Sequence, residues 1–266
     1  MSNKGAVELP KEQPWRTGRT AIPGVANYDA YMRAQLHKFD MDTQKYQKAD
    51  GTPDHEALRR SYEDNNVFHT KGGVSRESIK LVADWLTAHV PMRNKFALCH
   101  GTNMGFEMKY FREALPGFEV WGTELAPKTA KLANWTINWD FHVVKPEWRA
   151  HADFVYSNAL DHSPNPGLAV TRWMEEVAPG GALIIEWSKF QIRGRKGLSK
   201  TDLFGGSYLH LYNVLKEAGA ANNFVVNTSF NNSHAFDKRS FSFRLWHVLT
   251  HAPAGKKCAG YLQSCI

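Results

Sequence analysis

Between residues 96 and 188, short apolar stretches alternate with stretches of helical pattern, and this alternation constrains the fold more than any other feature of the sequence. The stretches with strand character are FALCH (96–100), FEVWGTE (118–124), TINWDFHVV (136–144), ADFVYSN (152–158) and GALIIEWS (181–188). The helical stretches are 106–115, 127–134 and 167–177. Repeated strand–helix units build a parallel sheet, and strands this apolar are buried on both faces. The sequence therefore predicts an α/β fold with a doubly wound sheet.

Further elements extend this unit at both ends. Ser75 is predicted to cap a helix that runs to about His89. The residues expected on its inner face are Ile79, Val82, Leu86 and Val90. After the last apolar strand, residues 207–219 form a predicted helix ending at Gly219. Its periodicity would bury Leu209, Tyr212 and Leu215. Two later stretches, NNFVVNTSF and FSFRLWHVLT, are expected to pair antiparallel, so the sheet is mostly parallel with an antiparallel closing strand.

Two polar features stand at the carboxyl ends of the first two predicted strands, the edge where open α/β sheets bind ligands. The first is a turn in which Gly101, Asn103 and Gly105 are spaced as G-x-N-x-G. Glycine lets a backbone approach a ligand, and asparagine tolerates positive φ better than other non-glycine residues. The second is Glu124, 19 residues after Gly105, where a carboxylate can accept hydrogen bonds from both ribose hydroxyls.

Two more features follow at the next strand ends. Asp140 and Phe141 close the third predicted strand, where an acid and an apolar ring can hold an adenine. The segment SNALDH (157–162) follows the fourth strand, where a substrate would meet a cofactor. Each feature alone is equally typical of an ordinary turn, a surface acid or a core ring. Their order along the chain makes a nucleotide-like cofactor the better interpretation.

The ordered pieces CHGTNMG, WGTELAP, INWDF, DFVYSNALDH and APGGALIIEW resemble the class I methyltransferases that use S-adenosylmethionine. The resemblance covers about residues 75 to 250. It implies that Gly101, Asn103 and Gly105 pass the methionine part of the cofactor and that Glu124 holds its ribose. It further implies that Asp140 and Phe141 hold the adenine and that Ser157 and Asn158 lie near the carboxylate or sulfonium.

The sequence departs from that family in two places. Cys99 stands where the family often has an acid, and Asn103 replaces the middle glycine. These departures leave open a methyltransferase-like scaffold without activity. A nicotinamide enzyme has similar spacing, but it usually places its G-x-G-x-x-G turn in the first strand of the chain and keeps the middle glycine.

A methyltransferase must align its acceptor and, where the acceptor is protonated, remove a proton. Candidate bases after the fourth strand are Asp161 and His162, although His162 could equally cap the next segment or pack against the cofactor. Tyr208 and His210, at the start of the helix after the fifth strand, are the other catalytic candidates. His234 and Arg239 in the closing hairpin are also placed to reach the pocket. No motif indicates a metal site.

A basic loop follows the fifth strand, in a chain whose formal net charge is +7. Its cations are Lys189, Arg193, Arg195, Lys196 and Lys200. The loop suits a gate that meets an anionic substrate, a nucleic-acid patch, or simply a solvated segment. Nucleic acid is the less favoured partner, because no recognisable binding module accompanies the loop.

The segments outside the core are predicted as an N-terminal extension and helical cap (1–74) and a C-terminal tail (251–266), around a cofactor-binding domain at 75–250. The cap carries more aromatic rings than it can bury on itself: Tyr28, Tyr31, Phe39, Tyr46, Tyr62 and Phe68. They are expected to pack over the cofactor edge or onto a second copy of the chain, so a homodimer stays open. Caps of this kind are common in methyltransferases that act on small molecules.

Three cysteines suggest no disulfide framework, and a pairing or metal role for Cys258 and Cys265 is less favoured than a solvated tail. No apolar run reaches the roughly 18 to 20 residues of a membrane helix, and the N-terminus has no signal-like apolar region. We therefore expect a cytoplasmic methyltransferase that uses S-adenosylmethionine and modifies oxygen or nitrogen of a small polar molecule, anionic if the basic loop meets it. The alternatives are an RNA- or protein-directed methyltransferase and a non-catalytic binding protein.

Overall fold

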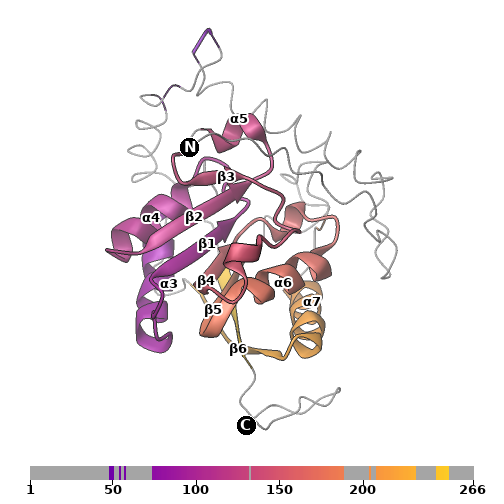
Figure 1. The fold of residues 1–266 in the computed structure, drawn as a ribbon. Coiled ribbons are helices and arrows are strands. Elements are labelled where there is room, and N and C mark those ends of the chain that lie inside the picture. The colour runs from indigo at the N-terminus through magenta and orange to yellow at the C-terminus, as the bar shows by residue number, and fades with distance from the viewer. Residues whose placement is uncertain are drawn as a thin grey trace, which may run out of the picture.

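The computed structural model describes residues 74–131, 133–188, 208–231 and 244–251, with positions 48–50, 54, 57 and 204 besides (Figure 1). Almost all of the predicted N-terminal cap lies outside these residues. So do the basic loop 189–200, His234, Arg239 and the cysteines of the C-terminal tail. Within the described part, no helix has the length and apolar character needed to cross a membrane.

The described strands form one seven-stranded sheet in the order β3-β2-β1-β4-β5-β7-β6. Their bounds are β1 Phe96–His100, β2 Glu119–Glu124, β3 Thr136–Asn138, β4 Ala152–Ser157, β5 Val177–Ser188, β6 Phe224–Asn231 and β7 Arg244–His251. Neighbours among β1 to β5 pair parallel, whereas β7 runs antiparallel to both β5 and β6. The predicted α/β class and the antiparallel closing strand are confirmed.

Helices cover both faces of this sheet (Figure 1). Helices α3 (Arg76–His89) and α4 (Phe106–Ala114) lie on one face, and α6 (Pro166–Glu176) and α7 (Tyr208–Ala221) on the other. The shorter elements are α5 (Pro127–Ala130), η2 (Pro146–Trp148) and η3 (Leu160–His162). Every residue of β1 and β4 is buried, because both faces of these central strands are covered.

Two apolar clusters separated by the sheet make up the core. The cluster on the α3/α4 face contains Leu86, Phe111 and Tyr156, and the cluster on the α6/α7 face contains Leu98 and Trp173. Alternate residues of each strand contribute to opposite clusters, as the period of two in a strand requires. Side chains on the same face of the sheet can therefore meet at its carboxyl edge.

The predicted start of α3 is confirmed. Ser75 Oγ accepts a hydrogen bond from the backbone N–H of Ser78 at 3.1 Å, which satisfies one of the free donors of the first turn. The side chains of Ile79, Val82 and Leu86 are fully buried. The capping residue and the spacing of apolar residues therefore located this helix correctly.

The predicted third strand is wrong beyond its first residues, since β3 ends at Asn138. The Asn138 side-chain amide donates to the backbone oxygens of Glu124 and Leu125 at 2.9 and 2.8 Å, which ties the strand end to β2. Asp140 Oδ1 then accepts the backbone N–H of His142 at 2.9 Å and closes a turn. Asp140 and Phe141 consequently lie in this turn and do not close a strand.

Two predictions for α7 are also wrong. The helix continues past Gly219 to Ala221, and a Cβ at position 219 would lie 2.8 Å from the backbone oxygen of Phe224. Close packing against β6 thus explains this glycine. Leu209 is 64% exposed and Tyr212 is half-buried, whereas Leu211 and Leu215 are buried. The inward face of α7 includes Leu211 in place of Leu209.

Candidate functional site

The turn after β1 has the backbone conformation that its sequence predicts. Gly101, Asn103 and Gly105 all adopt positive φ, at 69°, 45° and 77°. The backbone N–H groups of Gly101 and Thr102 both donate to Thr123 O at 3.0 Å, which fixes the turn against the end of β2. Gly105 is the N-terminal cap residue of α4. We call residues 101–105 the glycine loop.

Gly101 brings the glycine loop against the segments that follow β3 and β4. A Cβ added at this position would lie 2.4 Å from Ala159 Cβ and 3.6 Å from Phe141 Cε1. A Cβ at Gly105 would lie 2.8 Å from Ala133 Cβ. Both glycines are therefore required by packing within the protein as well as by their positive φ.

Glu124, the last residue of β2, ties this strand end to the glycine loop. Its Oε2 accepts the backbone N–H of Asn103 at 2.8 Å, and its Oε1 accepts that of Ala126 at 3.0 Å. Burial raises the pKa of the Glu124 carboxyl, and the backbone donors and His162 partly oppose this rise. Each carboxylate oxygen has a further lone pair, so Glu124 can still accept hydrogen bonds from a ligand.

Asn103 carries a buried acceptor at the same loop. Among the residues that the structure describes, its side-chain Oδ1 has no hydrogen-bond partner. Buried polar atoms are nearly always paired, so an unpaired one calls for an explanation. A donor on a bound ligand would supply the missing partner.

Asp140 begins a buried hydrogen-bonded relay. Asp140 Oδ1 lies 2.7 Å from His142 Nδ1, and His142 Nε2 lies 2.8 Å from Ser163 Oγ. Ser163 Oγ also accepts the backbone N–H of Asn165 at 3.1 Å. All atoms are satisfied when Nδ1 carries the proton and the Ser163 hydroxyl donates to Nε2. Ser163 has no exposed surface, so the relay fixes the Asp140 turn and is not a nucleophilic centre.

Phe141 is mainly a core residue. It is 8% exposed, and its ring meets that of Trp173 edge-to-face at 5.3 Å. Trp173 Nε1 also donates to the backbone oxygen of Phe141 at 3.0 Å. The structure therefore places Phe141 beside the glycine loop, with its ring largely engaged by α6.

Ser157 is the last residue of β4, and Asn158 follows it. Ser157 Oγ donates to His100 O and accepts the backbone N–H of Ala159, both at 3.1 Å. This fully buried hydroxyl joins β1 to the turn after β4. Asn158 is half-buried at the start of that turn.

The catalytic candidates Asp161 and His162 lie in η3, just beyond this turn. Asp161 Oδ1 and His162 Nε2 are 3.9 Å apart, and His162 is the more accessible of the two. His162 also acts electrostatically on Glu124. The structure thus brings His162 into the neighbourhood of the glycine loop without a short contact to Asp161.

Phe204 connects η3 to the start of α7 and was not identified from the sequence. Its backbone N–H donates to Asp161 O at 2.7 Å, and its ring packs edge-to-face on His210 at 5.0 Å. The structure therefore gathers the Asp161 and His210 candidates around one buried ring. An isolated aromatic residue before two glycines was the available signal.

A second missed feature is a buried pair beneath the glycine loop. His100 Nε2 lies 2.7 Å from Glu176 Oε2, its Nδ1 lies 2.9 Å from Thr123 Oγ1, and its ring stacks on Trp173 at 5.3 Å. Burial raises the pKa of Glu176, and His100 partly opposes that rise. Cys99, on the other face, is fully buried, and burial raises its thiol pKa well above the usual value.

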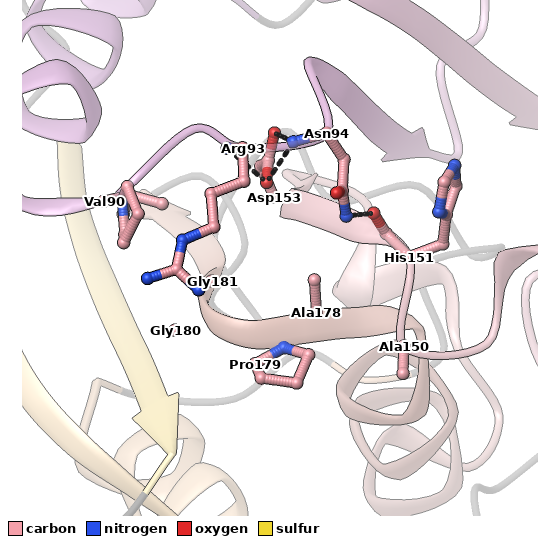
Figure 2. Close-up of a pocket in the computed structure, with 11 residues that line it drawn as sticks. Val90, Arg93, Asn94, Ala150, His151, Asp153, Ala178, Pro179, Gly180 and Gly181 are labelled. Carbon is pink, nitrogen blue, oxygen red and sulfur yellow. Dashed lines mark hydrogen bonds between the residues drawn. The ribbon is translucent and has the colours of Figure 1, made fainter.

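A cavity of about 380 Å³ lies at the opposite, amino-terminal edge of the sheet (Figure 2). Asp153 accepts backbone N–H groups of Arg93, Asn94 and Lys95 there, at 2.7 to 3.1 Å. Gly181 packs against the backbone of Asp153, where a Cβ would lie 2.6 Å from its oxygen. None of the predicted site residues lines this cavity, so it is separate from the site at the carboxyl edge.

No protein-family model matches the sequence, and no curated protein matches it. Solved structures do match. Geranyl diphosphate C-methyltransferase from Streptomyces coelicolor A3(2) has a TM-score of 0.53 at 9% identity, over 84% of this chain and 98% of that one. Magnesium protoporphyrin IX methyltransferase from Synechocystis PCC 6803 has a TM-score of 0.50 at 13% identity, over 82% and 93%. The [4+2]-cyclase SpnF has a TM-score of 0.50 at 12% identity, over 74% and 92%.

These similarities and the strand order together define the class of fold. The chain has the Rossmann-like fold of the class I methyltransferases, as its sequence motifs predict. At these identities the likeness concerns the fold, and a fold of this kind hosts more than one chemistry. The side chains at the carboxyl edge therefore determine the chemistry.

Proposed function

We propose that this protein is an S-adenosylmethionine-dependent methyltransferase that modifies oxygen or nitrogen of a small polar molecule. One observation carries the proposal: the segments after β1, β2, β3 and β4 meet around the glycine loop. Glu124 binds the Asn103 N–H at 2.8 Å, and Gly101 packs on Ala159 and Phe141. This is the carboxyl edge, where open α/β sheets hold nucleotide-like ligands.

The residues at this edge fit the cofactor chemically. The unpaired Asn103 Oδ1 suits a donor such as the ammonium group of a methionine moiety. Glu124 would accept from the ribose hydroxyls, and Asp140 and Phe141 would hold the adenine, with Ser157 and Asn158 close to the methionine end. The Streptomyces structure is a complex with S-adenosylhomocysteine, and the Synechocystis structure has bound S-adenosylmethionine. Both support this choice of cofactor.

The cofactor supplies a methyl group already activated for transfer, so the protein has to bind and align the two reactants. The relay from Asp140 through His142 to Ser163 would keep the adenine end fixed. A protonated acceptor also needs a base, and His162, Asp161, Tyr208 and His210 are the candidates that we propose. His162 is the accessible imidazole beside the glycine loop.

Isothermal titration calorimetry with S-adenosylhomocysteine tests the proposal. Glu124→Ala removes a carboxylate that accepts charge-assisted hydrogen bonds, each worth about 1.5 to 3 kcal/mol, so the dissociation constant should rise about tenfold or more. Glu124→Gln, which keeps the side-chain size, should bind with intermediate affinity.

Glu119→Ala is the matched control, because Glu119 begins the same strand at the other edge and is exposed. Its affinity should equal that of the unmodified chain. An absence of binding at millimolar cofactor, or equal losses in the two alanine variants, would refute the proposal.

A second candidate is a methyltransferase-like protein that binds the cofactor and does not transfer its methyl group. Two observations favour this candidate: the match to a [4+2]-cyclase, and the buried Cys99 in place of an acid. Incubation with methyl-labelled cofactor separates the two. Binding without label transfer to any acceptor of a metabolite extract would favour the second candidate.

A further inference from the structure

Four aromatic rings gather where β5 and β7 meet the start of α7. They belong to Trp187, Tyr208, Tyr212 and His247, and we call them the aromatic wall. The Tyr208 ring lies 6.0 Å from Trp187 at 77° and 5.2 Å from His247 at 30°. Tyr212 packs on both Tyr208 and His247, at 6.3 and 6.0 Å. Offset and edge-on contacts of this kind hold the rings in fixed positions.

The aromatic wall stands beside the proposed site of methyl transfer. Ile185 pairs with Ser157, the last residue of β4, on one side and with His247 on the other. Paired residues point to the same face of a sheet, so Ser157 and His247 share the α6/α7 face. Two strand spacings separate them, about 10 Å.

His247 adds no positive charge to the aromatic wall at neutral pH. His247 has no exposed surface, and burial lowers its pKa to about 4, so its imidazole carries no charge. The four residues of the aromatic wall therefore present ring faces and no carboxylate that could pair with a cationic ligand.

Part of this wall is open to solvent. Tyr208 is 39% exposed and the adjacent Leu209 is 64% exposed, and these are the two large apolar side chains that the described residues expose. Apolar exposure concentrated at one place commonly marks a binding surface. His210, also exposed, and Asp161, linked to it through Phe204, place polar groups beside it.

We infer that the methyl acceptor is a flat aromatic molecule that stacks on the exposed ring of Tyr208, with Leu209 at its edge. The inference rests on the proposed function and names its substrate class. The Tyr208 ring lies within 30° of the planes of Tyr212 and His247, and it is the exposed member of these three rings. Near-parallel rings suit a planar ligand that continues the stack, whereas recognition of an aliphatic ammonium uses several ring faces that converge on it.

Two pairs of probes test the inference by calorimetry in the presence of S-adenosylhomocysteine. The first pair is 4-hydroxybenzoate and 4-hydroxycyclohexanecarboxylate, and the second is catechol and cyclohexane-1,2-diol. Each pair shares its polar groups and differs in the planar ring. At least one aromatic member should bind about two- to twelvefold more tightly than its saturated partner.

Variants at Tyr208 locate the binding. Tyr208→Phe keeps the ring and should hold the aromatic probe within about twofold, whereas Tyr208→Leu keeps apolar volume and should weaken it about two- to twelvefold. Phe118→Leu is the control, because Phe118 precedes β2 at the far edge, and it should leave probe affinity unchanged. Thermal unfolding of each variant reports whether it folds.

The inference is overturned if both saturated probes bind as tightly as their aromatic partners, or if Tyr208→Leu binds the aromatic probe as well as the unmodified chain. It is also overturned if choline binds more tightly than the aromatic probes and loses affinity in Tyr208→Leu. Titration of S-adenosylhomocysteine alone on the same samples tests the proposed function separately. Ring binding that depends on Tyr208 without cofactor binding would sink the proposed function and leave the aromatic site standing.

Discussion

Gly101→Ala should destabilise the protein by more than the backbone alone requires. Position 101 has φ 69°, and an alanine pays about 1 to 2 kcal/mol to adopt the left-handed region. The new Cβ would also lie 2.4 Å from Ala159 Cβ, a distance that forces one segment to move. Overpacking of this kind costs about 1 to 3 kcal/mol. The two effects together give a loss of about 2 to 5 kcal/mol.

Gly117→Ala separates these two effects. Gly117 has φ 85°, and a Cβ there would have no atom within 4 Å. This variant should lose only the backbone cost, about 1 to 2 kcal/mol. The difference between the two variants, about 1 to 3 kcal/mol, measures the contact between the glycine loop and Ala159.

Urea unfolding followed by circular dichroism measures both losses, with the slope of the transition as a check that the unfolded states match. Calorimetry with S-adenosylhomocysteine should show a large loss of affinity for Gly101→Ala and none for Gly117→Ala. Equal stabilities of the two variants would refute the claim that Ala159 holds the glycine loop in place. Unchanged cofactor affinity in a folded Gly101→Ala protein would refute the claim that the cofactor passes this loop.

Three further predictions concern buried polar groups. Burial raises the pKa of Glu107 well above 4.5, so the folded chain keeps a proton that the unfolded chain loses. The free energy of unfolding should therefore fall as pH rises from about 4.5 toward the folded pKa. Urea titrations across pH should show that Glu107→Gln removes this fall. The pKa of His247 is lowered from 6.5 to about 4, so the free energy of unfolding should fall by up to about 3 kcal/mol as pH drops through this window. If His247→Phe shows the same dependence of stability on pH, His247 is not the group responsible. Ser163→Ala leaves His142 Nε2 buried without its donor and should lower the free energy of unfolding by about 1 to 3 kcal/mol. Cofactor binding should weaken as well, because the relay fixes the Asp140 turn. Unchanged stability would show that the relay is dispensable.

Local patterns were enough to predict most of the fold. The α3 boundary followed from the Ser75 cap and the apolar spacing, and β1 and β4 followed from their continuous apolar runs. The predicted third strand is too long, because the whole stretch TINWDFHVV is apolar enough for a strand. Side-chain hydrogen bonds from Asn138 and to Asp140 end it early, and these depend on neighbours that the local pattern does not specify.

The candidate site was only partly predictable for the same reason. The positive φ values of the glycine loop follow from its residue types, and the place of Glu124 at the end of β2 follows from the spacing. The His100–Glu176 pair joins residues 76 positions apart. The contact of Phe204 with Asp161 in η3 also joins residues that are distant along the chain. Such pairs form only when the strands take their order in the sheet. The sequence therefore shows each residue but does not show that the two will meet.

The position of β7 in the sheet has a consequence for how the chain is made. Among the described strands β7 comes last along the chain, yet it lies between β5 and β6. On the ribosome, β6 therefore emerges before the strand that joins it to the rest of the sheet. Until residues 244–251 are available, β5 presents an open, apolar edge to other chains. Nascent chains paused before residue 244 should thus depend on chaperones, and a slow step of sheet closure should follow release.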